Sequence, residues 1–166
     1  MKNLKGFTLI EVLIYIGLFG VLVGGAVTAA FSILESDGRT QVKALMQQEG
    51  DFVVAKINWT MSGAKNVNAP AVNATGSSLS VGKWDTSTGD PIVITFTDPN
   101  VTIARGAAAP EMLNSADVTV SSFVVRHEYL GGSNPESVTV SFTLHGRTPN
   151  GMPLTGDFTT TNYIRR

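Results

Sequence analysis

The strongest pattern in the chain is an uninterrupted apolar segment near its N-terminus. Residues 12–34 contain no Asp, Glu, Lys or Arg over 23 positions. A helix rises about 1.5 Å per residue, so about 20 such residues cross a hydrocarbon core of roughly 30 Å. Lys2 and Lys5 precede the segment, and Glu35 and Asp37 follow it. This asymmetry predicts a single membrane-spanning helix with its N-terminus in the cytoplasm and the rest of the chain outside.

A pattern with helical period follows the apolar segment. Apolar residues recur there at spacings of mostly three or four, as in an amphipathic helix. We expect the helix to pass a polar break at residues 35–38, with room for a bend near Gly38, and to stop at Ser62-Gly63. Its apolar stripe should cover one face of a sheet. The stripe comprises Val42, Leu45, Met46, Phe52, Val53, Ile57 and Met61.

The period changes to two in the C-terminal half of the chain. Residues 66–78 and 106–116 are rich in small and polar residues and read as loops. Strands that follow one long helix predict an α+β fold, in which the helix packs on an antiparallel sheet. The expected strands are residues 78–81, 92–97, 101–105, 118–129, 138–145 and 158–164.

Glu11 is a carboxylate beside the charge-free run. Such a group costs roughly 2.5–3.5 kcal/mol at mid-bilayer, and less near the edge. If the chain were cut before Phe7, the new α-amine would be largely cationic at neutral pH and would attract Glu11 strongly in a poor dielectric. Alternatively, Glu11 is solvated among the lipid headgroups, helped by the helix dipole. Glu11 alone does not decide between these interpretations.

Three interpretations of the whole segment compete. A cleaved secretory signal has an apolar region of about 7–15 residues, so this run is too long, although residues 28–30 are a tolerable cleavage site. An uncleaved signal anchor is the default for any single N-terminal span. A helix that assembles with other helices would use Gly20 and Gly24, whose G-x-x-x-G spacing permits close helix approach.

The string Lys5-Gly6-Phe7-Thr8-Leu9-Ile10-Glu11, followed by about twenty apolar residues, resembles the signal of type IV pilins and type II secretion pseudopilins. The resemblance implies that prepilin peptidase cuts between Gly6 and Phe7 and N-methylates Phe7. It implies that Glu11 neutralises the Phe7 amine of a neighbouring subunit during assembly. Residues 1–6 would then be the leader, residues 7–34 the assembly helix and residues 35–166 an extracytoplasmic head domain.

The same resemblance implies the partners and the type of subunit. The partners would be prepilin peptidase, other pilin or pseudopilin subunits, an inner-membrane assembly platform and membrane lipid. Thr28 stands where many major pilins have a helix-kinking proline. The strand pair around residues 118–129 and 137–144, with the ending at residues 158–165, resembles J-type minor pseudopilins. A minor subunit is therefore expected.

Composition removes several other classes of function. The net charge is −1, so the chain has no basic footprint for nucleic acid. There is no cysteine, which excludes disulfides, thiolate zinc sites and a cysteine nucleophile. No phosphate-binding loop or nucleophile motif is present either. We expect a protein that is not an enzyme and that uses no cofactor or metal.

The remaining chemical residues are given structural interpretations. His127 and His145 are expected to be structural or exposed, because neighbouring strand residues point to opposite faces and give no metal spacing. Asp85, Ser87 and Asp90 bracket a glycine-containing loop, but they are too few for a calcium loop. Trp59 and Trp84 are expected to pack in the core or near an interface. The sequons at Asn58, Asn73 and Asn100 occur about as often as chance predicts and are not read as glycosylation sites.

Overall fold

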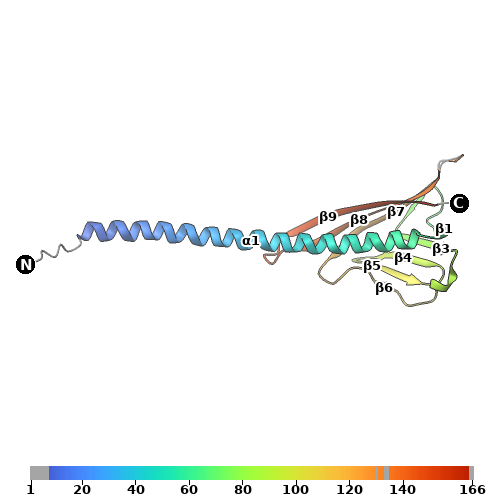
Figure 1. Cartoon of the computed structure of the whole chain (residues 1–166), viewed down its shortest axis with the longest axis horizontal. Helices are drawn as coiled ribbons and strands as arrows, with labels where there is room; N and C mark the ends of the chain where they lie inside the picture. The colour runs from blue at the N-terminus through green and yellow to red at the C-terminus, as the bar shows by residue number, and fades with distance from the viewer. Residues whose placement is uncertain (1–7, 130, 133–134, 165–166) are drawn as a thin grey trace, which may run out of the picture. The chain divides into compact units, whose positions relative to one another are not determined.

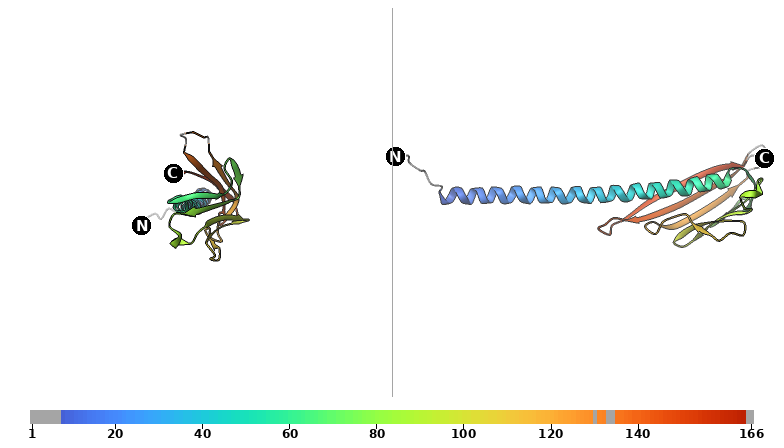
Figure 2. Two further views of the ribbon diagram at one scale, coloured as in Figure 1. Left: turned by 90° about the vertical axis from the view of Figure 1, so that its right-hand side faces the viewer. Right: turned by 60° about the horizontal axis from the view of Figure 1, so that its bottom comes forward.

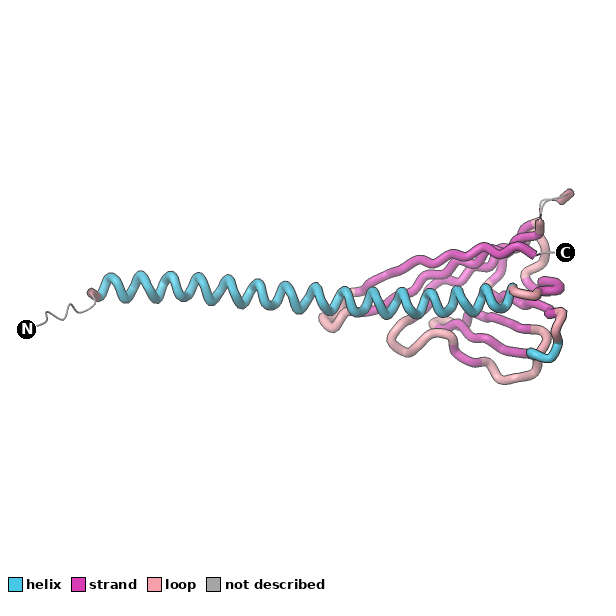
Figure 3. The backbone as a smooth tube through the Cα atoms, viewed as in Figure 1, coloured by secondary structure: helices cyan, strands magenta, loops and turns pink. Residues whose placement is uncertain are grey.

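The computed structural model describes residues 8–129, 131–132 and 135–164 of the chain. The chain divides into two compact units, Met1–Thr40 and Gln41–Arg166. One helix, α1 (Leu9–Met61), supplies the regular structure of the first unit and the first element of the second. All strands follow it in the sequence (Figures 1 and 3).

The helix is continuous through the polar residues that follow the apolar segment. Glu35 and Arg39 form an ion pair at 3.5 Å, and the Thr40 hydroxyl donates to the Ser36 carbonyl at 3.0 Å. Both contacts join residues four apart, which are neighbours on a helix surface. The polar stretch therefore interrupts the apolar pattern without interrupting the helix.

Two antiparallel sheets follow α1 in the second unit (Figure 2). Within the described residues, one sheet has the strand order β1-β3-β4-β5-β6 and the other β2-β7-β8-β9. The first sheet comprises β1 (Ala64–Ala69), β3 (Ser78–Lys83), β4 (Ile92–Thr97), β5 (Asn100–Arg105) and β6 (Glu111–Met112). The second comprises β2 (Ala74–Gly76), β7 (Thr119–Glu128), β8 (Glu136–Arg147) and β9 (Pro153–Ile164). The predicted α+β class is confirmed, with two sheets in place of one.

The prediction of a loop at residues 66–78 was wrong, because β1 and β2 lie largely within it. These two strands are the outermost strands of their sheets. An edge strand needs little apolar surface, so its sequence can be polar and still pair. The short β6 lies within the second expected loop for the same reason. The strands that the two-residue alternation did predict lie further inside the sheets than β1 and β2, or carry an apolar face that points into the core.

The core lies between the last five turns of α1 and both sheets. The described buried apolar residues form one cluster, to which the helix contributes Met46, Val53, Ile57 and Met61. Val42 and Leu45 pack on its margin as predicted. Phe52 does not: its side chain is 47% exposed. Adjacent helix residues are about 100° apart, so Phe52 cannot share the face that buries Val53.

The end of α1 is stabilised by a residue of β3. Gly63 has a φ of +68°, the left-handed conformation that commonly ends helices. The Lys83 ammonium donates to the Trp59 carbonyl at 2.9 Å and also to the Ser62 carbonyl. Burial lowers the pKa of Lys83. A cation at this position meets the unpaired carbonyls and negative dipole of a helix C-terminus, where the last turn of α1 has no basic residue of its own.

The outward face of β8 and β9 carries a ladder of hydrogen-bonded side chains. Four directly opposed pairs follow one another along the two strands. Each pair is joined by a side-chain hydrogen bond of 2.8–3.2 Å. Cross-strand pairs of this kind contribute roughly 0.2–1 kcal/mol each. The pairs are Thr139–Thr161, Ser141–Thr159, Thr143–Asp157 and His145–Thr155.

Gly50 sets how closely α1 approaches the second sheet. It is buried, and a methyl group added there would overlap the ring of Phe158 on β9. That ring stacks on Phe142, with centroids 5.3 Å apart and planes at 10°. Phe158 therefore has a neighbour on each side. The helix can lie against the ring because position 50 has no side chain.

We predict that Gly50→Ala destabilises the second unit by about 1–2 kcal/mol. A glycine-to-alanine change inside a helix ordinarily stabilises by roughly 0.5–1 kcal/mol. Here overpacking, which typically costs about 1–3 kcal/mol, should reverse the sign. Denaturant unfolding of the full chain in detergent micelles measures the change. Lys43→Ala at an exposed position of the same helix is the control and should stay within about 0.5 kcal/mol. A stabilised Gly50→Ala variant would contradict the packing described.

Candidate functional site

Thr8 and Glu11 form the start of α1. Thr8 immediately precedes the helix, and its hydroxyl accepts a hydrogen bond from the Glu11 backbone N–H at 3.4 Å. This is the position of an N-cap residue, which satisfies one of the first backbone N–H groups of a helix. Glu11 is an acidic residue in the first turn, where the positive end of the helix dipole favours a carboxylate.

The Glu11 side chain is held by a residue one turn further along. The Tyr15 hydroxyl donates to Glu11 Oε1 at 3.2 Å. Tyr15 was not among the residues predicted from the sequence. Its position four residues after Glu11 could have indicated the contact, because residues four apart on a helix lie side by side. Gly6 and Phe7, the predicted cleavage and methylation positions, lie outside the described residues, and their roles remain predictions.

The apolar part of α1 is not buried against the rest of the described residues. A membrane-length window of the helix has a mean hydropathy of 2.2, and none of it is buried. By length and composition α1 can cross a membrane. A methyl group added at Gly20 or Gly24 would meet nothing within 4 Å. The predicted close-approach surface is therefore open for contacts with lipid or another helix.

Thr28 lies within the continuous helix α1. Its hydroxyl donates to the Gly24 carbonyl at 2.9 Å, four residues earlier. A proline at position 28 would instead remove a helix hydrogen bond and kink the helix. Gly24 and Thr28 therefore lie within an ordinary stretch of α1.

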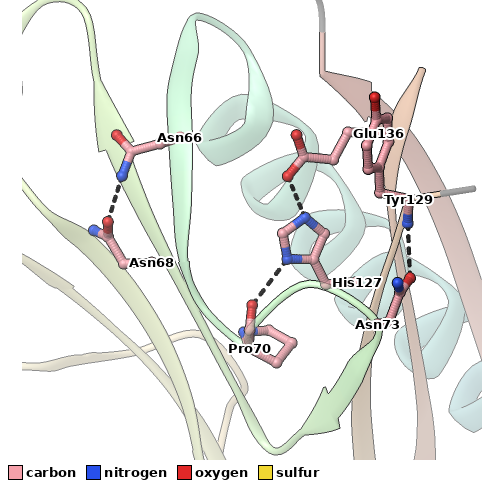
Figure 4. A network of polar contacts seen from close by, with 7 residues as sticks. All are labelled: Asn66, Asn68, Pro70, Asn73, His127, Tyr129 and Glu136. Carbon is pink, nitrogen blue, oxygen red and sulfur yellow. Dashed lines mark hydrogen bonds and ion pairs between the residues drawn. The ribbon is translucent and has the colours of Figure 1, made fainter. Parts of the chain in front are cut away.

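His127 forms a buried polar contact that the sequence did not indicate. His127 is 1% exposed and Glu136 is 7% exposed. The imidazole Nδ1 lies 2.9 Å from the Pro70 carbonyl, and Nε2 lies 2.5 Å from Glu136 Oε1 (Figure 4). A carbonyl only accepts, so Nδ1 must carry a proton. The second imidazole nitrogen and the carboxylate then share one proton between them.

The same network closes the chain segment between β1 and β2. The Asn73 N–H donates to the His127 carbonyl at 2.7 Å. The Tyr129 N–H donates to Asn73 Oδ1 at 3.0 Å (Figure 4). Asn73 has a φ of +60°, a left-handed conformation that asparagine tolerates better than most residues. The histidine therefore joins the connection between the two sheets to the β7–β8 pair, which is a structural role.

The other predicted candidates are separated in space or exposed. Asp85 accepts from the Ser87 N–H at 3.0 Å, and hydrogen bonding to Ser87 lowers the Asp85 pKa. Asp90 accepts from the Lys83 N–H at 3.0 Å. Across the described ranges, no group of three His, Cys, Asp or Glu residues could hold a metal ion. His145 lies on the outward ladder, where Nε2 is 2.6 Å from the Ser121 hydroxyl.

The two tryptophans lie outside the core. Trp84 is 72% exposed and Trp59 is 38% exposed. Of the two expected positions, the core is therefore wrong for Trp84, and a position near an interface stays a prediction. Each ring has cationic neighbours instead. The Lys65 ammonium lies 5.4 Å from the Trp84 ring, and Lys83 and Arg105 lie 5.1 Å from Trp59. Cation–π contacts at exposed sites contribute about 0.5–1 kcal/mol, which helps to hold these rings at the surface.

The fold is α+β, with one long N-terminal helix packed against antiparallel sheets, and this arrangement is consistent with a pilin-like architecture. Residues 1–27 match the family model described as the prokaryotic N-terminal methylation motif. The match supports membership of the type IV pilin and pseudopilin family, whose precursors are processed by prepilin peptidase. No curated protein and no solved structure matches the chain. The motif and the apolar helix fit a single-pass protein anchored in the inner membrane.

We predict that His127→Leu destabilises the second unit by about 3–5 kcal/mol, because it removes the imidazole that contacts the buried Glu136 carboxylate. Glu136→Gln should cost no more than about 1 kcal/mol, because a neutral amide of the same shape can donate to Nε2. The double change His127→Leu with Glu136→Leu should recover part of the loss. Denaturant unfolding of the full chain in micelles measures all three. Equal costs for the two single changes would contradict the shared-proton contact.

Proposed function

We propose that this protein is a structural subunit of a type IV pilus or type II secretion-like filament, assembled through its N-terminal helix. The observation that carries the proposal is the methylation motif at residues 1–27, joined to a helix with one carboxylate beside an exposed apolar surface. The chain is inserted with its N-terminus in the cytoplasm and its head domain outside. Prepilin peptidase cuts between Gly6 and Phe7 and methylates the Phe7 amine.

Assembly moves the apolar helix from lipid into a bundle of like helices. Apolar contacts between helices resemble apolar contacts with lipid. They therefore do little to fix the position of one helix along another. A charged pair does fix it, because an isolated charge in a poor dielectric is costly wherever it lies. The Glu11 carboxylate pairs with the Phe7 amine of the neighbouring subunit. One such contact per subunit fixes the axial position of each new helix.

We infer that the subunit is a minor pilin or pseudopilin. Thr28 supports this, because its hydrogen bond to Gly24 belongs to a regular helix where many major pilins have a proline. The long β7–β8 pair and the closing strand β9 support the J-type resemblance. A minor subunit would begin or cap the filament. Its role would be structural, with no catalytic residues and no cofactor.

The alternative is a signal-anchored binding domain that never assembles. This protein would use the same apolar helix as a simple anchor, and Glu11 would be solvated among headgroups. It would keep Met1–Gly6 or lose about thirty residues. The two hypotheses therefore differ in the covalent structure of the mature N-terminus.

We predict that the protein isolated from its native membrane begins at N-methylated Phe7. Intact mass and mass spectrometry of the N-terminal peptide measure this directly. Gly6→Ala should slow or block cleavage and leave the full leader attached, which provides the control for the assignment. A mature chain that keeps residues 1–6, or that begins near Phe31, would favour the anchored domain.

We predict that Glu11→Ala lowers filament incorporation at least tenfold while membrane insertion continues. Removing one partner of a buried ion pair costs about 3–5 kcal/mol, and each 1.4 kcal/mol corresponds to a factor of ten. Quantitative detection of the subunit in sheared filaments and in membranes separates the two effects. Glu111→Ala, at an exposed head-domain position, is the matched control. Normal incorporation of Glu11→Ala would count against the assembly mechanism.

A further inference from the structure

The spacing of Thr8, Glu11 and Tyr15 places two different hydrogen-bond donors within reach of the Glu11 carboxylate, the backbone N–H of Thr8 and the hydroxyl of Tyr15. A threonine N-cap followed three residues later by glutamate is the pattern of a capping box. In that motif the glutamate side chain reaches back to the backbone N–H of the cap residue. Half of the motif is present, since the Glu11 N–H donates to the Thr8 hydroxyl at 3.4 Å. Among the described residues, the carboxylate bonds to Tyr15 instead, at 3.2 Å.

The two partners lie in opposite directions along α1. Thr8 is three residues before Glu11, and Tyr15 is four residues after it. The Tyr15 hydroxyl has one hydrogen to donate, and it occupies Oε1. An ionised carboxylate accepts about four hydrogen bonds, so Oε2 retains its capacity. The Tyr15 contact thus holds the side chain in place and leaves one oxygen available.

We propose that Tyr15 is a positioning residue that keeps the Glu11 carboxylate away from the start of its own helix and available to a neighbouring subunit. The inference rests on the proposed function. After cleavage, the α-amine of Phe7 is one residue before Thr8. A carboxylate turned back toward Thr8 would therefore approach the amine of its own chain. Pairing within one subunit would neutralise both charges and remove the attraction between subunits.

The hydroxyl of Tyr15, more than its ring, is the group that matters. The side chain is 54% exposed on an apolar helix, where a phenylalanine ring would be equally suited to lipid or to a helix bundle. A phenol adds one polar atom, and that atom contacts Glu11. Hydrogen bonds to ionised groups are among the stronger ones, and they strengthen in a poor dielectric. The contact therefore favours a Glu11 carboxylate that points toward Tyr15 over one that points back toward Thr8.

Tyr15→Phe tests this role by removing the hydroxyl alone. We expect filament incorporation to fall about 3- to 10-fold, the effect of one modest hydrogen bond. Cleavage after Gly6 and the amount of subunit in the membrane should not change. Tyr163→Phe makes the same chemical change on β9 of the head domain, at a side chain that is 65% exposed, and should assemble normally.

A second measurement follows the carboxylate itself. Processed subunits in lipid bilayers, labelled with ¹⁵N at Phe7 and ¹³C at the Glu11 carboxyl, can be examined by dipolar-coupling solid-state NMR. With isotopically dilute labelling, we expect no short intrasubunit contact in the wild-type protein and a clear contact in Tyr15→Phe. A merely structural role for Tyr15 would not create this contact.

Two results would overturn the proposal: wild-type incorporation of Tyr15→Phe, or an intrasubunit contact already present in the wild-type protein. Either result, with Glu11→Ala still blocking incorporation, would leave the proposed function standing. Normal incorporation of Glu11→Ala would instead remove the assembly mechanism on which both proposals depend.

Discussion

A carboxylate at the margin of a long apolar helix must find a partner, and this requirement organises the N-terminal part of the molecule. Glu11 is held at its backbone by the Thr8 hydroxyl and at its side chain by Tyr15. Each contact is local, because the two partners lie three and four residues away along the chain. The large exposed apolar area that follows is stable in lipid or in a bundle of helices, and in neither case does it supply a charge. The neighbouring subunit proposed above would supply that charge.

The head domain meets a similar constraint in its interior. His127 and Glu136 are both buried, and each would be costly alone. Together with the Pro70 carbonyl they satisfy the polar atoms of the pair while binding the β1–β2 connection to β7. That connection is one of those in which the chain passes from one sheet to the other. The packing of α1 depends on an absence of side-chain volume, since Gly50 admits the ring of Phe158.

Much of the fold could be predicted because the apolar periods are strong where burial is strong. The stripe that includes Val53 and Ile57 specified the buried face of the helix, and the alternation in residues 92–97 gave β4 with its observed bounds. The edge strands were missed because exposed pairing needs hydrogen bonds more than apolar residues, and a polar sequence hides it. Glu136 was missed because its partner His127 lies nine residues away, across a connection whose geometry no local pattern specifies. Trp84 was misassigned because size predicts burial only on average, and nearby cations can hold a ring at the surface.

The hydroxyl ladder on β8 and β9 has a consequence for how the head domain responds to its medium. Two of its rungs, Thr139–Thr161 and Ser141–Thr159, join neutral groups. Salt screens ion pairs at exposed positions but has little effect on a bond between two hydroxyls. Neither partner titrates at ordinary pH. These two rungs thus give the outer face of the sheet cross-strand cohesion that is indifferent to ionic strength and acidity.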